Sequence, residues 1–493
     1  MRRYVIGFLL IFAFWNSSYG QTFPVKTIVE NGPRDNRINM VFLGDGYQIT
    51  EMNKYEEDVQ ATIEKIFNEM PYSQYKNLFN VYAIEVPSKE SGTDHPGTAP
   101  DCPYKDSVFF HDTYFNTTFD FGGAVNGIHR LLVAQNYTAI NNVLINNFPD
   151  YDMVMMVVNH HWYGGSGGSI SVYSTNTLSA EIAIHEAGHS FGGLADEYGG
   201  TAHNKFDGIN VTQHTELGLI PWNTWISPET PLPTPPNASN TEVIGLFEGA
   251  YYSDVGMYRP KLHCKMRELN VPFCEVCTEQ LIKSMFGYVD LIDSYQPDST
   301  SITLYTNDKA GFDINMVQLS SKEVSVEWAL DGNIINENVT NVLLDGPNIK
   351  VGKHNLSVTA KHNTELVRKD PDNLLESTVS WTVNVVNPTD VNEDKIPNEF
   401  VLEQNYPNPF NPSTTIKFSI PTVETQHAAS QHVILRIYDI LGKEIATLVK
   451  EEKSPGNYEV AFNTGDYSLP SGIYFYKLTA GSFSETKKML LLK

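Results

Sequence analysis

The residues of this chain whose types and spacing indicate chemistry lie between positions 181 and 198. His185 and His189 are four residues apart, so on an α-helix they project from one face, one turn apart. Two imidazoles placed in this way can hold one Zn²⁺ ion. Glu186 then lies beside the metal, where its carboxylate can take a proton from metal-bound water. The pattern therefore predicts zinc-assisted hydrolysis with Glu186 as the general base.

The residues around this motif favour a metal site over a solvated helix face. Gly192 and Gly193 end the predicted helix, and the run resembles the extended metzincin motif. Ala195 occupies the position of the third metzincin ligand and cannot bind metal. The third ligand is therefore expected to be Asp196, the nearest carboxylate, with Glu197 as the alternative. Apolar residues predict that the helix is buried: Ile182, Ile184, Ala187 and Phe191.

Residues 1–20 have the pattern of a secretory signal peptide. Arg2 and Arg3 precede the apolar run Tyr4–Trp15, and Ser18–Gly20 resembles a cleavage site. A membrane anchor or a buried helix is the alternative, but the run is too short to span a bilayer. No other stretch is long and apolar enough, so no stable membrane span is predicted.

The charge and the cysteines limit the partners and the cross-links of the chain. A formal net charge of −24 argues against nucleic acid or an anionic membrane as partner.

The chain contains four cysteines: Cys102, Cys264, Cys274 and Cys277. In an exported chain they favour two structural disulfides, with three possible pairings. The alternative is that Cys274-x-x-Cys277 forms half of a second metal site, although no second such pair exists.

An α/β sheet is expected to carry the zinc helix. Apolar runs predict strands at 38–43, 79–86 and 153–158, the last of them central. Helices are predicted after Thr50, as N-cap, and at about 138–148. The glycine-rich segment 163–168 follows the third strand and would let a substrate backbone approach the sheet edge. His160 and His161, just before it, are conceivable alternative ligands.

Residues 256–268 predict a tight turn that carries a methionine. Met266 in this turn is expected to pack beneath the metal without binding it, as in the Met-turn of metzincins. Stabilisation of the oxyanion requires a further donor near the metal, and Tyr258 is the predicted residue.

Six segments within residues 36–285 together resemble the IgA-peptidase family of zinc metallopeptidases. The resemblance implies an endopeptidase with one zinc ion, so we expect a secreted enzyme that hydrolyses peptide bonds of extracellular proteins. It does not specify the substrate. The segments that carry it are Val41–Tyr47, Glu90–Asp94, Tyr163–Gly168, His185–Tyr198, Tyr258–Pro260 and Cys264–Arg267.

The second half of the chain predicts two all-β domains. Alternating strands between 295 and 387 indicate an immunoglobulin-like β-sandwich, and residues 388–399 form a linker. Residues 400–493 resemble the C-terminal sorting domain of type IX secretion. That resemblance implies the type IX machinery as partner, passage across the outer membrane and removal of the domain. The whole prediction is a signal peptide (1–20), an α/β metzincin-like catalytic domain (21–294) and two β-sandwich domains.

A second function class fits the same domain order. The chain would then be a catalytically inactive, surface-attached protein that binds proteins or glycans and keeps a relic metal site. Intact His185, Glu186 and His189 argue against this alternative, because loss of the general base would be its simplest sign.

Overall fold

The structure, a computed structural model of the chain, describes residues 21–202, 204–319, 324–388, 397, 399–421, 431–467, 469–481 and 483–492. The predicted signal peptide, residues 1–20, lies outside the described residues, as does most of the predicted linker. The chain comprises two compact units, one containing the α/β part and most of the strands that follow it. The other unit is centred on residues 384–493. Mixed α/β structure followed by β-sheet regions is confirmed, whereas the domain boundaries stay predictions.

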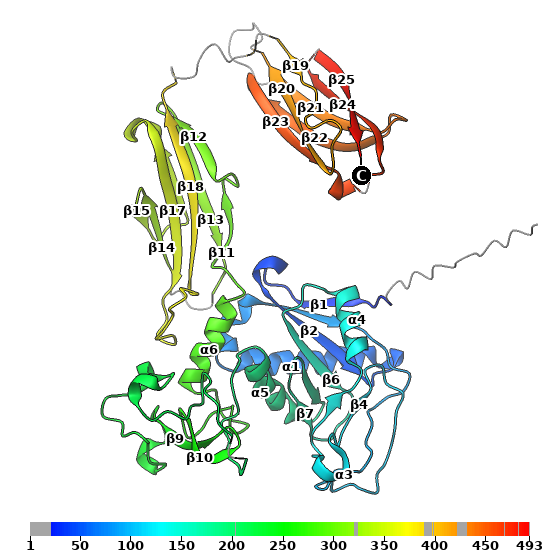
Figure 1. Cartoon of the computed structure of the whole chain (residues 1–493), viewed down its shortest axis with the longest axis vertical. Coiled ribbons are helices and arrows are strands. Elements are labelled where there is room, and N and C mark those ends of the chain that lie inside the picture. The colour runs from blue at the N-terminus through cyan, green and yellow to red at the C-terminus, as the bar shows by residue number, and fades with distance from the viewer. Residues whose placement is uncertain are drawn as a thin grey trace, which may run out of the picture. The chain divides into compact units, whose positions relative to one another are not determined.

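A six-stranded sheet forms the centre of the α/β part (Figure 1). The four inner strands run parallel and both edge strands are antiparallel to them. The inner strands are buried throughout, which explains their apolar sequences. The three predicted strands are present, and the third is central. In spatial order the strands are β1 (Val25–Val29), β3 (Phe79–Ile84), β2 (Ile38–Asp45), β6 (Met153–Val158), β8 (Ser171–Ser174) and β7 (Gly165–Ser166).

Helices cover both faces of this sheet (Figure 1). α4 (Tyr137–Asn147) packs into the core on one face. α1 (Met52–Asn68) and α5 (Ser179–Ser190) contact each other on the opposite face. Gly44 of β2 leaves room there for the ring of Tyr55, which a Cβ would approach to 2.7 Å. The α5 helix is thus held between the sheet and α1.

The start of α1 differs from the prediction. A 3₁₀ turn, Ile49–Glu51, precedes the helix, so Thr50 is not its N-cap. Gln48 and Glu51 instead form a reciprocal capping box around this turn, and the cap residue Gln48 lies two residues before the predicted one. The face of α1 that packs on the core is buried at Tyr55, Val59, Ile63 and Ile66.

Two further segments of the α/β part have little regular structure. Residues 85–136 contain only two two-residue strands and a four-residue helix, and residues 191–274 contain one hairpin and short 3₁₀ turns. Among the described residues, no helix is long and apolar enough to cross a membrane. The helices and strands of the α/β part not yet named are α2 (Tyr72–Tyr75), β4 (Thr117–Thr118), α3 (Gly123–Asn126), β5 (Val133–Ala134), β9 (Phe247–Ala250), β10 (Ser253–Arg259) and α6 (Glu275–Phe286).

All four cysteines are buried and free. Cys102 lies beside His95, whereas Cys264, Cys274 and Cys277 gather at the start of α6. Two disulfides are therefore not formed, and the prediction of them is wrong for this structure. The Cys264 and Cys277 sulfur atoms are 3.6 Å apart, whereas a disulfide requires about 2.05 Å.

Eight strands follow the α/β part and form a three-stranded and a five-stranded sheet. Trp328 and Trp381 are fully buried and stack with ring centroids 5.8 Å apart. The alternating burial along these strands matches their alternating sequences. The sheets are β11 (Ile292–Gln296), β13 (Lys309–Met316) and β16 (Asn341–Asp345), and β12 (Ser301–Tyr305), β18 (Glu376–Val386), β17 (Gly352–His362), β14 (Val324–Leu330) and β15 (Asn333–Glu337).

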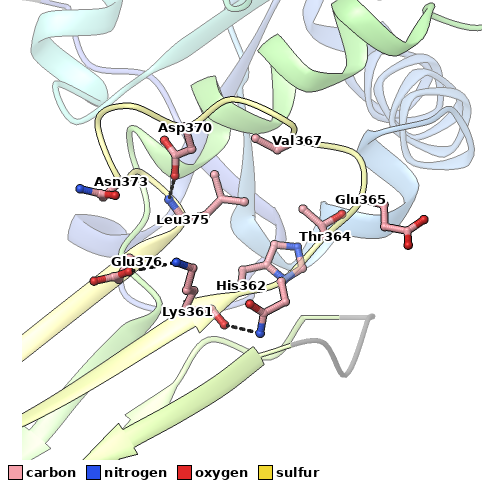
Figure 2. A pocket seen from close by; sticks show the side chains of 10 residues that line it. Lys361, His362, Thr364, Glu365, Val367, Asp370, Asn373, Leu375 and Glu376 are labelled. Carbon is pink, nitrogen blue, oxygen red and sulfur yellow. Dashed lines mark hydrogen bonds and ion pairs between the residues drawn. The ribbon is translucent and has the colours of Figure 1, made fainter. Parts of the chain in front are cut away.

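The loop between β17 and β18 encloses a hollow of about 470 Å³ (Figure 2). The Asp370 carboxylate accepts the backbone N–H of Leu375 at 3.0 Å and so closes the loop. The loop then contacts the α/β part, because Glu279 of α6 accepts the backbone N–H groups of Arg368 and Lys369 at 3.0 and 2.8 Å. None of the residues that the sequence analysis selected lines this hollow.

The second unit ends in two sheets that share one apolar core. The strands are β19 (Val401–Leu402), β20 (Ser413–Ile420) and β23 (Gly456–Asn463), and β22 (Glu444–Lys453), β21 (Gln431–Tyr438), β24 (Gly472–Ala480) and β25 (Phe483–Leu491).

Candidate active site

Helix α5 places His185 and His189 one turn apart on one face. The Nδ1–H of His185 donates to the carbonyl oxygen of Lys265 at 2.8 Å, and that of His189 donates to Leu194 at 2.7 Å. A carbonyl oxygen can only accept, so each ring carries its proton on Nδ1 and keeps a lone pair on Nε2. The two Nε2 atoms are 3.2 Å apart. Both rings are thus oriented as ligands.

Asp196 completes a set of three converging donors. Its Oδ1 lies 3.2 Å from Nε2 of His185 and 3.3 Å from Nε2 of His189. A tetrahedral ion with bonds of about 2.0–2.1 Å requires ligand atoms about 3.3 Å apart. The spacing of the three atoms therefore fits a zinc-sized cation. Glu197, the alternative ligand, is fully buried elsewhere, with Oε1 3.2 Å from the sulfur of Cys277.

A left-handed turn returns the chain from α5 to the histidines. Gly193 has a φ of +63°, a conformation that glycine adopts without steric cost. The next residue, Leu194, donates its N–H to the carbonyl oxygen of Gly188 at 3.0 Å, which closes the helix end. Asp196 follows two residues later. Gly192 and Gly193 therefore follow the end of the helix, as the sequence predicted.

Glu186 lies at the open side of the three donors. Its Oε2 is 4.0 Å from Nε2 of His189. Burial raises the pKa of the Glu186 carboxyl, while the neighbouring histidines act to lower it. The glycine-rich segment passes directly over this carboxylate, since a Cβ on Gly167 would collide with Oε2. Only glycine at position 167 leaves Glu186 its place.

Met266 lies beneath α5, as expected of the predicted turn. It is fully buried, and a Cβ on Gly188 would come within 2.5 Å of its sulfur. Its carbonyl oxygen accepts the N–H of Glu197 at 2.8 Å. The backbone carbonyl oxygen of the preceding residue, Lys265, accepts the hydrogen bond from Nδ1–H of His185. The turn therefore contacts both His185 and the segment that carries Asp196.

A buried ion-pair network anchors this turn to α5 and α1. Lys265 Nζ lies 2.6 Å from Glu181 and 3.2 Å from Glu69, and Lys65 lies 2.7 Å from Glu181. The backbone N–H of Asn270 also donates to Glu181 at 3.0 Å. Burial opposes the charge of Glu181, but the two lysines outweigh it and lower the pKa to about 2. Lys265 is thereby held where its carbonyl oxygen meets His185.

A strained turn between β9 and β10 brings a tyrosine to Asp196. Tyr251 and Tyr252 have φ values of 47° and 61°, which are uncommon for residues with a bulky side chain. Their N–H groups donate to the carbonyl oxygens of Asp196 and Tyr198 at 3.1 and 3.0 Å. The Tyr252 hydroxyl donates to Oδ2 of Asp196. Strain of this kind persists where the surroundings hold it, often at functional sites.

Tyr258, the predicted oxyanion donor, does not line the cleft. It lies on β10, where its backbone pairs with Thr212 at 2.8 and 3.0 Å. The structure does not bring His160 or His161 to the donor set either. Their rings stack on each other with centroids 4.9 Å apart, and His160 stacks on Phe109. These three predictions relied on distance along the chain, which does not report the direction of a side chain.

The donor set opens into a cleft of about 660 Å³. The glycine-rich segment and Tyr252 both line this cleft. Arg130 lines this cleft and a second hollow beside Glu186, and thus brings a positive charge next to the Glu186 carboxylate. Neither Arg130 nor Tyr252 lies in a motif, so no sequence pattern marks these two residues.

A sequence profile of the IgA Peptidase M64 family matches residues 26–240 and 236–285, more than half of the chain. The chain belongs to this family. The resemblance inferred from the sequence is confirmed, and the family is one of metallopeptidases. A secretion system C-terminal sorting domain matches residues 404–492. Among curated proteins, no sequence matches the chain.

Similar solved structures contribute no further argument. Fibronectin(III)-like modules of Clostridium thermocellum CbhA are 16% identical, and the match covers 19% of this chain and 95% of that one, with a TM-score of 0.14. A β-glucuronidase of Parabacteroides merdae is 5% identical, and the match covers 48% of this chain and 28% of that one, with a TM-score of 0.25. The chain thus matches less than a third of the glucuronidase.

Proposed function

We propose that this M64 peptidase is a secreted zinc endopeptidase that hydrolyses peptide bonds of extracellular proteins. The observation that carries the proposal is the convergence of two Nε2 atoms and one carboxylate oxygen, 3.2–3.3 Å apart, beside Glu186. His185, His189 and Asp196 would hold the metal. The fold proposed is metzincin-like, with α5 as the zinc helix and Met266 beneath it.

The donor chemistry fits a cation. Three electron-pair donors face one another, and only a positive charge between them makes such an arrangement favourable. Two imidazoles with one carboxylate form a known catalytic zinc set. The chemistry that zinc supplies when bound is polarisation of a carbonyl group and acidification of water.

The side chains of the chain supply the remaining steps. Glu186 accepts a proton from the attacking water and returns it to the leaving amine nitrogen. Tyr252 fixes the Asp196 carboxylate through its hydroxyl. Arg130, which lines the same cleft, replaces Tyr258 as the proposed source of positive charge near the developing oxyanion. Gly165–Gly168 leave the edge of the sheet open to an extended peptide.

Glu186→Ala tests the mechanism. The variant should keep its zinc, measured by mass spectrometry of the metal, and lose nearly all cleavage of casein. Glu64→Ala, on the exposed face of α1, is the matched control and should behave as the wild type. Cleavage by Glu186→Ala at the wild-type rate would refute the proposed base. Zinc binding without cleavage by the wild type, across a range of protein substrates, would instead favour the inactive binding protein.

Asp196→Ala tests the ligand set. It should release the catalytic zinc, whereas Glu197→Ala should leave that zinc bound more tightly than Asp196→Ala does. An unchanged zinc content in Asp196→Ala would refute the assignment.

The sorting domain directs secretion to the cell surface or the extracellular space. We propose that residues 400–493 act only in export and are removed afterwards. Deletion of this segment should leave purified protein active and block export from the native cell. Loss of activity in the purified truncated protein would show that the segment supports the catalytic part.

A further inference from the structure

A second cluster of metal-binding side chains lies behind the candidate active site. It consists of Glu197, Cys264, Cys274 and Cys277, whose ligand atoms all lie within 4.8 Å of one another. Every member is buried. The cluster brings together three segments: the chain after α5, the methionine turn and the start of α6.

The spacing of these atoms fits a tetrahedral metal better than a disulfide. The sulfur atoms of Cys264 and Cys277 are 3.6 Å apart, and Cys277 sulfur is 3.2 Å from Oε1 of Glu197. Around zinc, with Zn–S bonds of about 2.3 Å, two sulfur atoms lie about 3.8 Å apart and a sulfur and an oxygen about 3.5 Å apart. A disulfide would require one sulfur pair at about 2.05 Å and would leave the third thiol unpaired.

One carboxylate oxygen of this cluster lacks any hydrogen bond. Oε1 of Glu197 accepts the side-chain N–H of Asn210 at 2.9 Å, but Oε2, also buried, has no partner among the described residues. An unsatisfied buried carboxylate oxygen is strongly unfavourable, so it indicates a missing partner. The guanidinium of Arg259, itself buried, lies close enough to interact with Glu197 and Cys264 and would balance part of their charge.

The expected export of the chain also favours a metal site at these three cysteines. In an oxidising compartment, three thiols that touch one another tend to form disulfides unless they are held otherwise. Coordination by a metal keeps thiolates apart and unreactive. From the geometry, the unpartnered oxygen and this exposure to oxidation, we infer that Glu197, Cys264, Cys274 and Cys277 bind a structural zinc ion. A closed set of four protein ligands leaves no position for water or substrate.

This site would position the catalytic ligands from behind. Glu197 adjoins Asp196, and Cys264 adjoins Lys265, whose carbonyl oxygen accepts the hydrogen bond from Nδ1–H of His185. A metal that joins these two neighbours fixes two contacts of the catalytic donor set. Loss of the structural ion should therefore weaken binding of the catalytic ion as well.

A third cluster of side chains that can bind metal contains two histidines, one cysteine and one aspartate, and it supports a second inference independently of the first. His95, Cys102, Asp120 and His129 lie within the irregular segment 85–136, and their ligand atoms are also within 4.8 Å of one another. His95 donates Nδ1–H to the carbonyl oxygen of Ser107 at 2.6 Å. Its Nε2 lone pair then faces the sulfur of Cys102 at 3.3 Å and Oδ2 of Asp120 at 3.2 Å.

The burial of this cluster excludes a nucleophilic cysteine. Cys102 is only 6% exposed, whereas a nucleophilic thiol must be reachable by its substrate. Residues 85–136 contain few hydrogen-bonded strands or helices to hold them. The geometry points to a second structural zinc ion here, which would brace the segment that carries Arg130 to the cleft.

Both inferences predict that the full-length wild-type protein holds three zinc ions per chain and four free thiols. The thiols are counted with a thiol reagent after denaturation without reductant. Two thiols instead of four would mean a disulfide among Cys264, Cys274 and Cys277, and would overturn the first structural site. This measurement requires no variant and so does not depend on variant folding.

Variants assign each ion to its cluster. Cys277→Ser and Cys102→Ser should each lower the zinc content by one structural ion, and each is the matched control for the other. Asp196→Ala should remove the catalytic ion and leave two, so failure of the proposed function is distinguishable from failure of these sites. An unchanged zinc content in a folded cysteine variant would refute the corresponding site.

Cobalt substitution gives a readout separate from activity. Cobalt bound to thiolate shows a sulfur-to-metal charge-transfer band, and the catalytic donor set contains no thiolate. The wild type should show this band, Cys277→Ser should lose most of it, and Cys102→Ser should lose the smaller part. A cobalt-loaded wild-type protein without any such band would overturn both inferences.

Discussion

Replacement of Glu181 by glutamine should destabilise the α/β part, and acid should reduce the difference from the wild type. The Glu181 side chain is 3% exposed and pairs with Lys265 and Lys65. Burial opposes its charge, but these lysines lower the pKa from 4.5 to about 2. Because the folded-state pKa lies below the unfolded value, ionisation of Glu181 stabilises the fold above pH 4.5. That contribution is lost as the pH falls through 2.

The size of the effect follows from the two pKa values. A decrease from 4.5 to about 2 corresponds to roughly 3 kcal/mol at pH 7 and about 1.4 kcal/mol at pH 3. Glu181→Gln also leaves Lys265, 1% exposed, with one fewer partner. The free energy of unfolding should therefore fall by roughly 3–5 kcal/mol at pH 7. Between pH 7 and pH 3 the difference from the wild type should shrink by about 2 kcal/mol.

Urea denaturation followed by far-ultraviolet circular dichroism at 222 nm measures this difference. All α-helices of the described residues lie between 52 and 286, so the helical signal reports the α/β part. Glu64→Gln, exposed on α1, is the control and should show no pH-dependent difference beyond that of an ordinary surface carboxyl. A difference for Glu181→Gln that stays constant between pH 7 and pH 3 would refute the pKa argument. A difference below about 1 kcal/mol at pH 7 would refute the energetic role of the network.

Three predictions concern the cleft. Tyr252→Phe removes the hydroxyl that donates to Asp196. Both kcat/KM and zinc affinity should therefore fall by about 10-fold or more. Equal values for Tyr252→Phe and the variant of its neighbour, Tyr251→Phe, would contradict this role. Gly167→Ala should lose activity and keep zinc, because the added Cβ collides with the Glu186 carboxylate. Gly218→Ala, which has open space around the added Cβ, is the control. An active Gly167→Ala enzyme would refute the collision. Arg130→Ala should lower kcat by about 10²-fold with little change in zinc content; a change confined to KM would assign Arg130 to substrate binding instead.

Local patterns were sufficient for the parts of the fold that depend on neighbours in the chain. Apolar runs identified β2 and β6, because strands buried on both faces require apolar side chains throughout. The four-residue spacing of His185 and His189 placed both rings on one face of α5 because helix geometry is local. The sorting domain and the family were also identified from contiguous motifs.

Contacts between distant segments could not be derived in this way. Choosing Asp196 over Glu197 near the histidines depends on how the turn at Gly193 orients two adjacent carboxylates, which the order of residues leaves open. Tyr252 reaches Asp196 across 56 positions, and no motif marks it.

The cysteines show the same boundary between sequence and tertiary structure. Their number and the Cys274-x-x-Cys277 spacing are properties of the sequence, and they allowed either disulfides or a metal site. Cys277 and Glu197 are 80 positions apart and meet only because α6 packs behind the methionine turn. Residue types thus limited the chemistry to thiols, imidazoles and carboxylates. Packing of distant segments decided which of them share a site, because ligand geometry depends on distances in space rather than along the chain.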